Sequence, residues 1–194
     1  MKRKIFTLAL TLCFVFPVFA FVVPTVGGED LQGNVLAVTN GSDSGSGSLR
    51  DVIANANDGD TVIFAPGVKT VTLTSGEISF KINNLTIDGG SGVTVTKAPS
   101  PAFRLLDCIA KTGTLTLNGL TFENGNYGSA VYIGNNTVIT NCVFRNNIGG
   151  GLGLRSSLNN NVLTDCVFIG NTSQGVGGGM SIGQSTTTLT NCIF

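Results

Sequence analysis

The sequence contains no histidine and no tryptophan, and charged residues make up only 11% of its 194 positions. Without histidine, a histidine-ligated zinc site and any mechanism based on an imidazole base are excluded. Cations and acids are equal in number, at 11 each, but three cations and no acid lie within residues 1–20. The remainder therefore carries eight cations against eleven acids, a balance of −3 that predicts no nucleic-acid partner.

What the chain has instead of charge is a repeated short pattern. Thr140-Asn141-Cys142-Val143-Phe144 returns with small changes at residues 164–168 and 190–194, and looser copies end at Phe122 and Ile87. Set in register, the copies fill three apolar columns. The first column is Ile82, Leu117, Ile139, Leu163 and Leu189; the second is Leu85, Leu120, Cys142, Cys166 and Cys192; the third is Ile87, Phe122, Phe144, Phe168 and Phe194.

The spacing of these columns indicates the kind of repeat. Successive members of the third column lie 35, 22, 24 and 26 residues apart, which is typical of solenoid repeats. The second and third columns are two residues apart, as on one face of a strand. The first and second are three apart, so a polar pair such as Thr140-Asn141 must turn a corner between them. Short strands, polar corners and one coil per repeat predict an all-β parallel β-helix.

The repeat also predicts a core ladder, consisting of Phe122, Phe144, Phe168, Phe194, Cys142, Cys166 and Cys192. Three interpretations of the cysteines remain open: small core side chains, a disulfide between adjacent coils, or metal ligands. Adjacent strands lie about 4.7–4.9 Å apart, a distance that a disulfide can bridge. The cysteines share their column with leucines, which favours the core interpretation. We predict neither a metal nor a cofactor.

The start of the chain predicts export. Residues 1–20 combine a basic start, a short apolar run and a small-residue end, as a secretory signal does. A mobile lead-in is expected at residues 21–34 and an N-terminal cap of strand, loop and helix at residues 35–60. In that helix Leu49, Val52 and Ile53 share a face, and Ser48 with Asp51 forms a capping pattern. The β-helix is expected over residues 61–194.

Two sets of segments resemble known proteins. Residues 48–53 followed by 59–64 resemble the entry segment of bacterial secreted right-handed β-helix proteins, a Ser-Leu-Arg-Glu-Ala-Ile helix before a Gly-Asp-Thr-Ile-x-Phe strand. Residues 144–147 and 168–171 resemble the Phe-x-x-Asn half of the polymorphic outer-membrane protein repeat, and residues 128–131, 150–152 and 178–180 its Gly-Gly-Ala-Ile half. The resemblance covers residues 35–194. It implies a right-handed β-helix with a short N-terminal capping helix, exported as an adhesin or surface-displayed passenger.

Enzymes that cleave pectin and other glycans are similar in fold and carry acidic sets on an outer face. Here Asp88, Glu123 and Arg145 share one outward position of aligned copies. They can flank a sugar, but the pattern favours an opposite-charge ladder on a solvated face. Asp165 shares its column with asparagines and is expected to be a turn residue. We predict no catalytic residue, and the alternative function is the N-terminal part of a β-helix polysaccharide lyase or glycoside hydrolase.

The segments after the third column, residues 123–129, 145–150 and 169–178, vary in length, and variable loops on a rigid stack commonly carry recognition. Asn147 and Asn171 follow the phenylalanines at equivalent positions; they can form a ligand-facing row, but an internal hydrogen-bonded stack is favoured. The candidate contacts in the loops are Asn126, Tyr127, Asn146, Thr172 and Gln174.

We therefore predict an exported scaffold, secreted or displayed on the outer-membrane surface. Its predicted partner is a cell-surface glycan or a surface protein of a host or neighbouring cell. The chain stops on the third column with no return strand or cap. We expect the array to continue beyond Phe194, and membrane association only through that further part.

Overall fold

A computed structural model describes residues 33–155, 160–175 and 177–194. The chain divides into two units, and every described residue lies in the second unit, which runs from residue 31 to residue 194. The predicted signal segment at residues 1–20 and most of the predicted lead-in lie outside the described residues. No helix among the residues described has the length and hydrophobicity needed to cross a membrane.

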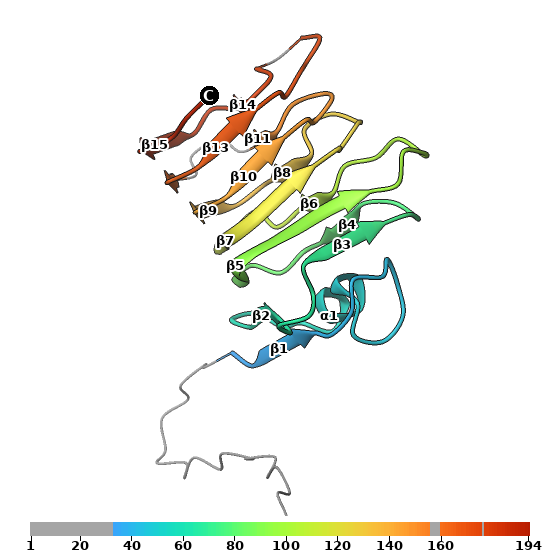
Figure 1. The fold of residues 1–194 in the computed structure, drawn as a ribbon. Coiled ribbons are helices and arrows are strands. Elements are labelled where there is room, and N and C mark those ends of the chain that lie inside the picture. The colour runs from blue at the N-terminus through green and yellow to red at the C-terminus, as the bar shows by residue number, and fades with distance from the viewer. Residues whose placement is uncertain (1–32, 156–159, 176) are drawn as a thin grey trace, which may run out of the picture. The chain divides into compact units, whose positions relative to one another are not determined.

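Strands joined side by side in parallel dominate the described chain, with one short helix near its start (Figure 1). The elements, in chain order, are β1 (Val35–Val38), α1 (Leu49–Ala54), β2 (Thr61–Phe64), β3 (Thr70–Leu73), β4 (Ile78–Phe80), β5 (Leu85–Lys97), β6 (Leu106–Cys108), β7 (Thr114–Glu123), β8 (Val131–Ile133), β9 (Asn136–Thr140), β10 (Val143–Arg145), β11 (Leu152–Leu154), β12 (Asn160–Thr164), β13 (Val167–Ile169), β14 (Met180–Ile182) and β15 (Thr186–Thr190).

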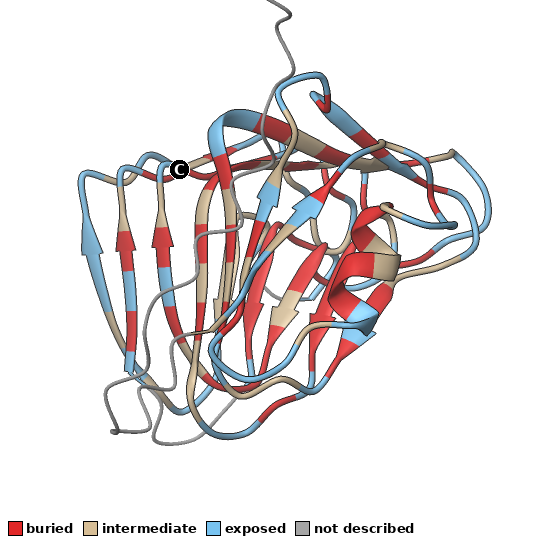
Figure 2. Cartoon of the chain, turned by 90° about the horizontal axis from the view of Figure 1, so that it is seen from below, coloured by how far each residue is buried: buried red, intermediate tan, exposed pale blue. Residues whose placement is uncertain are grey.

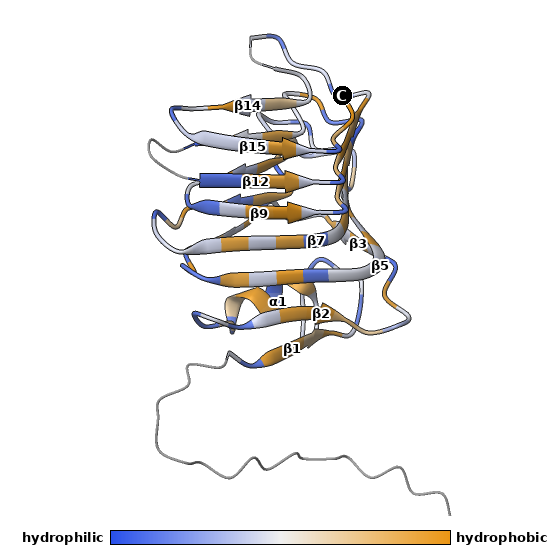
Figure 3. Cartoon of the chain, turned by 90° about the vertical axis from the view of Figure 1, so that its left-hand side faces the viewer, coloured by the Kyte–Doolittle hydropathy of each residue, from blue (hydrophilic) through white to orange (hydrophobic). Residues whose placement is uncertain are grey.

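The strands form two sheets that the chain visits in turn. The larger sheet has the order β1-β2-β5-β7-β9-β12-β15. In addition, β10 pairs with both β7 and β13, and β3 pairs with β5. The smaller sheet has the order β14-β11-β8-β6-β4. Figure 3 shows β7, β9, β12 and β15 stacked one above another. This winding confirms the predicted all-β solenoid with parallel strands.

The corner between the first and second columns depends on residues that tolerate a positive φ. Gly119, Asn141, Asp165 and Asn191 occupy this corner in successive coils, with φ of 61°, 53°, 54° and 52°. Asparagine, aspartate and glycine adopt this left-handed conformation at the lowest cost. The corner lets two inward side chains three residues apart both reach the core, and Asp165 is a turn residue as expected.

Phenylalanine rings stack where the third column was expected. Phe122, Phe144 and Phe168 are buried in the core, whereas Phe194 stacks on Phe168 but is 63% exposed and so departs from the predicted core ladder. The ring centroids of Phe144 and Phe168 lie 4.8 Å apart with planes 5° apart, and Phe168 and Phe194 are 4.7 Å apart. Phe122 lies 5.4 Å from Phe144 on the other side. Parallel pairing of Phe122, Phe144 and Phe168 sets this distance, because it repeats the spacing between strands. Buried residues line the coil interior in Figure 2.

The structure shows that the register expected for the first copy of the repeat is wrong. Parallel pairing joins Ile87 to Leu117 and Val95 to Phe122. Ile87 therefore belongs to the first column rather than the third, and Val95 fills the third. The cause is a longer corner at residues 89–92, where the register of β5 against β7 shifts. A glycine-rich insertion at a corner changes the count of residues without changing the two strands that it joins.

The same shift moves the other two columns of that copy. Leu85 pairs with Leu115, and Val93 is the residue that pairs with Leu120. Ile82 lies outside the strands and is only partly buried against the core. The second column at this coil is therefore Val93.

The expected three-residue charge ladder is also wrong in one member. Asp88 pairs with Asn118, whose Nδ2 donates to Asp88 Oδ1 at 2.9 Å. Glu123 and Arg145 do pair across β7 and β10, and their side chains form an ion pair. Asp88 lies at the corner, away from this pair.

The cysteines are free thiols in the part of the chain that the structure describes. Cys142 and Cys166 are fully buried, and the Sγ of each donates to a carbonyl two residues earlier, at 3.3 Å. Burial raises the pKa of Cys142 to about 12 and that of Cys166 to about 11. No three His, Cys, Asp or Glu side chains converge as metal ligands within the described ranges. The geometry is that of small core side chains.

The helix at the start of the coil packs its apolar face inward. Ser48 is its N-cap, and the Ser48 Oγ accepts from the backbone N–H of Asp51 at 3.2 Å. Leu49, Val52 and Ile53 are buried, as the red face of the helix in Figure 2 shows. A helix N-cap of this kind stabilises a short helix by about 1 kcal/mol.

Two buried carboxylates tie this first region to the coils. Asp60 is 1% exposed and accepts from the backbone N–H groups of Asn57 at 2.7 Å and Asn34 at 2.6 Å. These hydrogen bonds, led by that from Asn57, lower the pKa of Asp60 against the opposing effect of burial. Asn34, the last residue of the predicted mobile lead-in, is thus bound to the first coil. Asp43 forms an ion pair with Arg50 at 2.7 Å.

Candidate functional site

The candidate loops leave the coil at equivalent points. Strands β7, β10 and β13 end at Glu123, Arg145 and Ile169, and the next residue in each case has a positive φ. Asn124, Asn146 and Gly170 have φ of 64°, 55° and 64°. Each of these residues turns the chain outward after the third column, so the three loops are stacked on the same side of the solenoid.

An asparagine ladder lies beneath the loops. Asn147 is fully buried, and its Nδ2 donates to the Phe122 carbonyl at 3.1 Å and to Asn171 Oδ1 at 2.8 Å. Its Oδ1 accepts from the Gly125 N–H at 2.9 Å. Asn171 repeats the contact by donating to the Phe144 carbonyl at 2.8 Å. These side-chain amides form hydrogen bonds with backbone groups of the turns and do not face a ligand. They hold the loops in register.

Four of the five candidate contacts line one groove of about 460 Å³. We call it the loop groove. Its lining residues come from three successive coils and are Asn126, Tyr127, Gly128, Ile148, Gly149, Thr172, Ser173 and Gln174. The volume falls within the range of about 300–1,000 Å³ that is usual for small-ligand sites. Residues up to 48 positions apart in the sequence meet here because each coil presents its loop directly above the previous one.

The fifth candidate, Asn146, lies in an adjoining hollow of about 450 Å³. We call it the lysine hollow, because Lys97 lines it together with Pro99, Asn124, Asn126, Asn146 and Ile148. Asn126 and Ile148 border both the hollow and the loop groove. The two hollows are therefore neighbours on one side of the solenoid.

Lys97 is unusual because it is a buried cation. It is 5% exposed, its Nζ lies 4.8 Å from the centroid of the Phe103 ring, and it donates to the carbonyl of Ala98. Burial lowers its pKa. The cation–π contact and the carbonyl partly replace the water that the ammonium group has lost.

The exposed surface of the loop groove combines apolar and amide groups. Tyr127 is 62% exposed and Ile148 is 63% exposed. Asn126 is fixed, because its Oδ1 accepts from the Phe103 N–H at 3.2 Å. Thr172 is held opposite Ile148 by a parallel bridge between the two loops. An aromatic platform with fixed amide and hydroxyl groups around it suits a ligand that has both apolar faces and many hydroxyls.

Sequence reasoning missed Ile148 and Lys97. An isolated isoleucine in a loop of glycine and asparagine is a signal for an exposed apolar contact, and it could have been noticed. Lys97 gave no such signal, because its burial results from the register of β5, which the repeat pattern misplaced.

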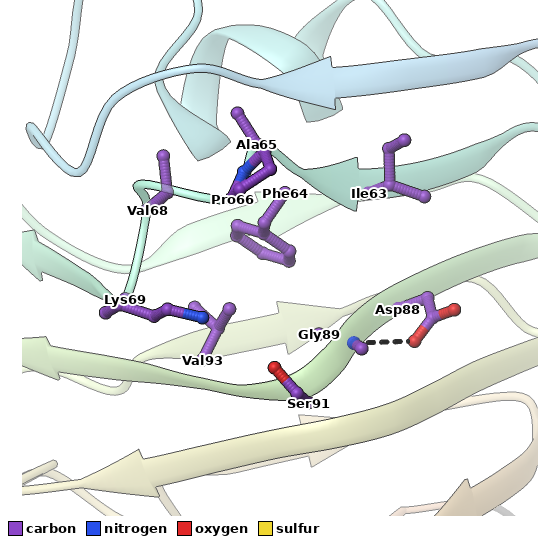
Figure 4. A pocket seen from close by; sticks show the side chains of 11 residues that line it. Ile63, Phe64, Ala65, Pro66, Val68, Lys69, Asp88, Gly89, Ser91 and Val93 are labelled. Carbon is purple, nitrogen blue, oxygen red and sulfur yellow. Dashed lines mark hydrogen bonds between the residues drawn. The ribbon is translucent and has the colours of Figure 1, made fainter.

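A further hollow of about 320 Å³ lies between β2 and the long corner of β5 (Figure 4). Phe64 lies in it, with Lys69 and Asp88 on its sides. The Asp88 Oδ1 accepts from the Gly90 N–H at 2.8 Å and so belongs to the corner itself. This hollow holds none of the candidate loop residues.

The fold can be compared with known families. The family model described as a right-handed β-helix region matches residues 70–194, well over half of the chain. No curated protein and no solved structure matches this chain. The matched region contains the strands from β3 to β15, the loop groove, the lysine hollow and the asparagine ladder. This chain belongs to the right-handed β-helix family.

Proposed function

We propose that this protein is an exported, surface-exposed scaffold that binds a glycan in the loop groove. One observation carries the proposal: Asn126, Tyr127, Thr172 and Gln174, selected as loop residues of different coils, line a single groove. The solenoid supplies a rigid support, and the loops supply the contacts.

The chemistry of the groove favours a sugar. An exposed tyrosine ring can stack on the C–H face of a pyranose, and the amides of Asn126 and Gln174 can each donate to and accept from hydroxyl groups. The volume of about 460 Å³ accommodates a short oligosaccharide segment. A protein partner usually needs a contact of about 800 Å² on each side, so a groove of this size favours the glycan.

Export is supported by the sequence of residues 1–20, which has the basic, apolar and small-residue parts of a secretory signal. The resemblance of residues 144–147 and 168–171 to repeats of polymorphic outer-membrane proteins supports display at the cell surface. Under this proposal the protein is an adhesin-like or passenger-like binding protein.

Isothermal titration calorimetry with defined hexasaccharides tests the proposal. The panel holds the neutral hexasaccharides of cellulose and chitin and the acidic hexasaccharides of hyaluronan and heparin. We expect at least one of them to bind, and Tyr127→Ala to weaken that binding about tenfold, because the stacking platform is lost. The matched control is Tyr127→Phe, which keeps the aromatic ring of the platform and removes only its hydroxyl group. A panel without any binder, or equal binding by Tyr127→Ala, would overturn the proposal.

A further inference from the structure

Beside the loop groove, on the outer face of the smaller sheet, four polar side chains converge: Arg104, Asp107, Tyr132 and Arg155. We infer that this cluster is an oxyanion-binding site, and that the ligand is an acidic glycan whose carboxylate or sulfate group it holds. The identity of the ligand as a glycan rests on the proposed function, whereas the oxyanion site rests on the geometry that follows. We call these four residues the guanidinium cluster.

The register of the smaller sheet brings the cluster together. Asp107 of β6 pairs with Tyr132 of β8, and Tyr132 pairs with Gly153 of β11. In each of these strands the flanking residues are buried in the core, so the middle residue faces outward. The outer face therefore presents a carboxylate, a phenol ring and a bare backbone position in consecutive coils.

Two guanidinium groups lie against the ring of Tyr132. The Arg104 Cζ is 4.6 Å from the centroid of the ring, and the Arg155 Cζ is 4.1 Å from it. Gly153 makes this arrangement possible: a Cβ there would lie 2.4 Å from Tyr132 Cδ2 and 2.7 Å from Ser129 Oγ. Any side chain at position 153 would displace the ring. The tyrosine thus fixes two arginines from different coils on one patch of surface.

The cluster has a surplus of positive charge. Two guanidinium groups share one carboxylate: Arg104 Nη1 is 3.5 Å and Arg155 Nη2 is 3.9 Å from the oxygens of Asp107. The second distance is too long for a hydrogen bond. Asp107 Oδ1 and Arg104 Nε are buried without a hydrogen-bond partner among the described residues. Buried polar atoms normally have partners, so both the charge and the donors of the cluster are incompletely used.

The cluster opens toward the loop groove. Arg104 lies 5.8 Å from the centroid of the Tyr127 ring, and a Cβ on Gly128 would lie 2.9 Å from Arg104 Nη2. Tyr127 and Gly128 both line the loop groove. The Arg155 side chain is 46% exposed and completes the outer side of the cluster. A sugar stacked on Tyr127 would thus lie beside the guanidinium group of Arg104, which also contacts Tyr132, and both tyrosines of the chain take part.

Guanidinium groups select the class of ligand. Their planar forks bind carboxylate and sulfate oxygens through paired N–H donors, more specifically than an ammonium group does. Asp107 would repel an anion if the arginines did not outnumber it. A net charge of about +1 on the cluster therefore favours one negative charge on the ligand.

The arginine Nε–Hε signals in two-dimensional NMR of the full chain provide the test. Three probes are titrated: methyl β-glucoside, methyl β-glucuronide and the sulfate ester of methyl β-glucoside. We expect either charged probe, or both, to shift the signals of Arg104 and Arg155, whereas the neutral probe leaves them in place. Which charged probe binds more tightly tells carboxylate from sulfate. Shifts from the neutral glucoside equal to those from the charged probes, or no shifts with any probe, would overturn the inference.

Variants test the charge balance. Arg155→Gln should weaken the charged probes about fivefold, while Asp107→Asn should tighten them about threefold, because it removes the only negative charge of the cluster. Arg145→Gln is the matched control, since Arg145 pairs with Glu123 elsewhere. If the cluster were only structural, both variants would bind the charged probes more weakly. Weaker binding by a folded Asp107→Asn protein, checked by its melting curve, would overturn the inference.

The hexasaccharide panel separates this inference from the proposed function. Tight binding of a neutral hexasaccharide with no preference for acidic ones would overturn the oxyanion site and leave glycan binding intact. Failure of every hexasaccharide, with Arg104 and Arg155 still shifted by the charged probes, would overturn glycan binding and support the oxyanion site.

Discussion

Asn147 donates its side-chain amide to the Oδ1 of Asn171, one coil further along, at 2.8 Å. The same Oδ1 accepts from the backbone N–H of Asn147 at 3.1 Å, so one amide holds two donors of the neighbouring coil. The loops that carry the exposed candidate residues are thus tied together from one coil to the next. The asparagine ladder therefore contributes to the stability of these loops.

The first prediction is that Asn147→Ala lowers the free energy of unfolding by about 2–3 kcal/mol, since it leaves the Phe122 carbonyl and the Gly125 N–H buried without partners. Urea denaturation measures the change. The control is Asn146→Gly, which alters the exposed neighbour, keeps a residue that tolerates its positive φ and is expected to change stability by less than about 0.5 kcal/mol. Equal effects of the two substitutions would contradict the role given to the ladder.

The second prediction concerns the phenylalanine stack. Phe144 is fully buried between Phe122 and Phe168, so Phe144→Ala should cost about 3–5 kcal/mol. In an array that is stabilised by nearest-neighbour contacts, the adjacent coils should also loosen. Hydrogen exchange should become faster in β7 and β13 as well as in β10. A thermal melt that does not differ from that of the unchanged protein would show that the ring contributes little.

The third prediction uses Asp43. Burial raises its pKa, but hydrogen bonds from Arg50 and Ser75, with the charge of Arg50, lower the pKa to about 2, against a usual value of 3.8. Because the pKa is lower in the folded state, the ionised carboxylate stabilises the fold at every pH above its pKa in the unfolded chain. This stabilisation is lost as the pH falls through about 2. Asp43→Asn should therefore be less stable than the unchanged protein at pH 7, and the difference should shrink below pH 3.8 and disappear near pH 2.

The control for that experiment is Asp165→Asn. Asp165 lies exposed at a corner whose equivalents in the neighbouring coils are Asn141 and Asn191. Its replacement should leave stability nearly unchanged at every pH. A constant deficit of Asp43→Asn down to pH 2 would show that lost contacts, rather than ionisation, account for its effect.

The fourth prediction concerns the buried thiols. Burial raises the pKa of Cys142 to about 12 and that of Cys108 to about 11, and a thiol reacts through its thiolate. At pH 8 neither residue should be alkylated by iodoacetamide in the folded protein, whereas both should react in urea. Mass spectrometry of the peptides measures each site. Rapid labelling of Cys142 in the folded protein would exclude it from the core.

The repeat pattern determined much of the fold because it is local. Alternation within Val143-Phe144-Arg145 places one side chain inward and its neighbours outward, whatever the rest of the chain does. The residues of the corners could be recognised for the same reason, since Asn141 and Asp165 tolerate a left-handed backbone. The pattern failed at Ile87, where an insertion at residues 89–92 shifted the register by an amount that no local rule supplies.

For the candidate site, too, the sequence predicts one part and the structure supplies the other. That Tyr127 and Thr172 lie in loops on one side of the stack follows from the sequence alone, because equal positions of a solenoid repeat are stacked. That they border one groove with Ile148 required the structure, since the path of each loop depends on packing against the next.

For the later copies of the repeat, the sequence by itself determined which side chains of a strand point inward and where the coil turns, because a strand has a period of two residues and its corners need particular residue types. Only the tertiary structure decided that Arg104, Tyr132 and Arg155 meet on one outer face. They lie 28 and 23 residues apart, at positions that are not equivalent in the repeat. Their contact depends on the rotamers of long side chains and on the space left by Gly153, and neither follows from a pattern of residues along the chain.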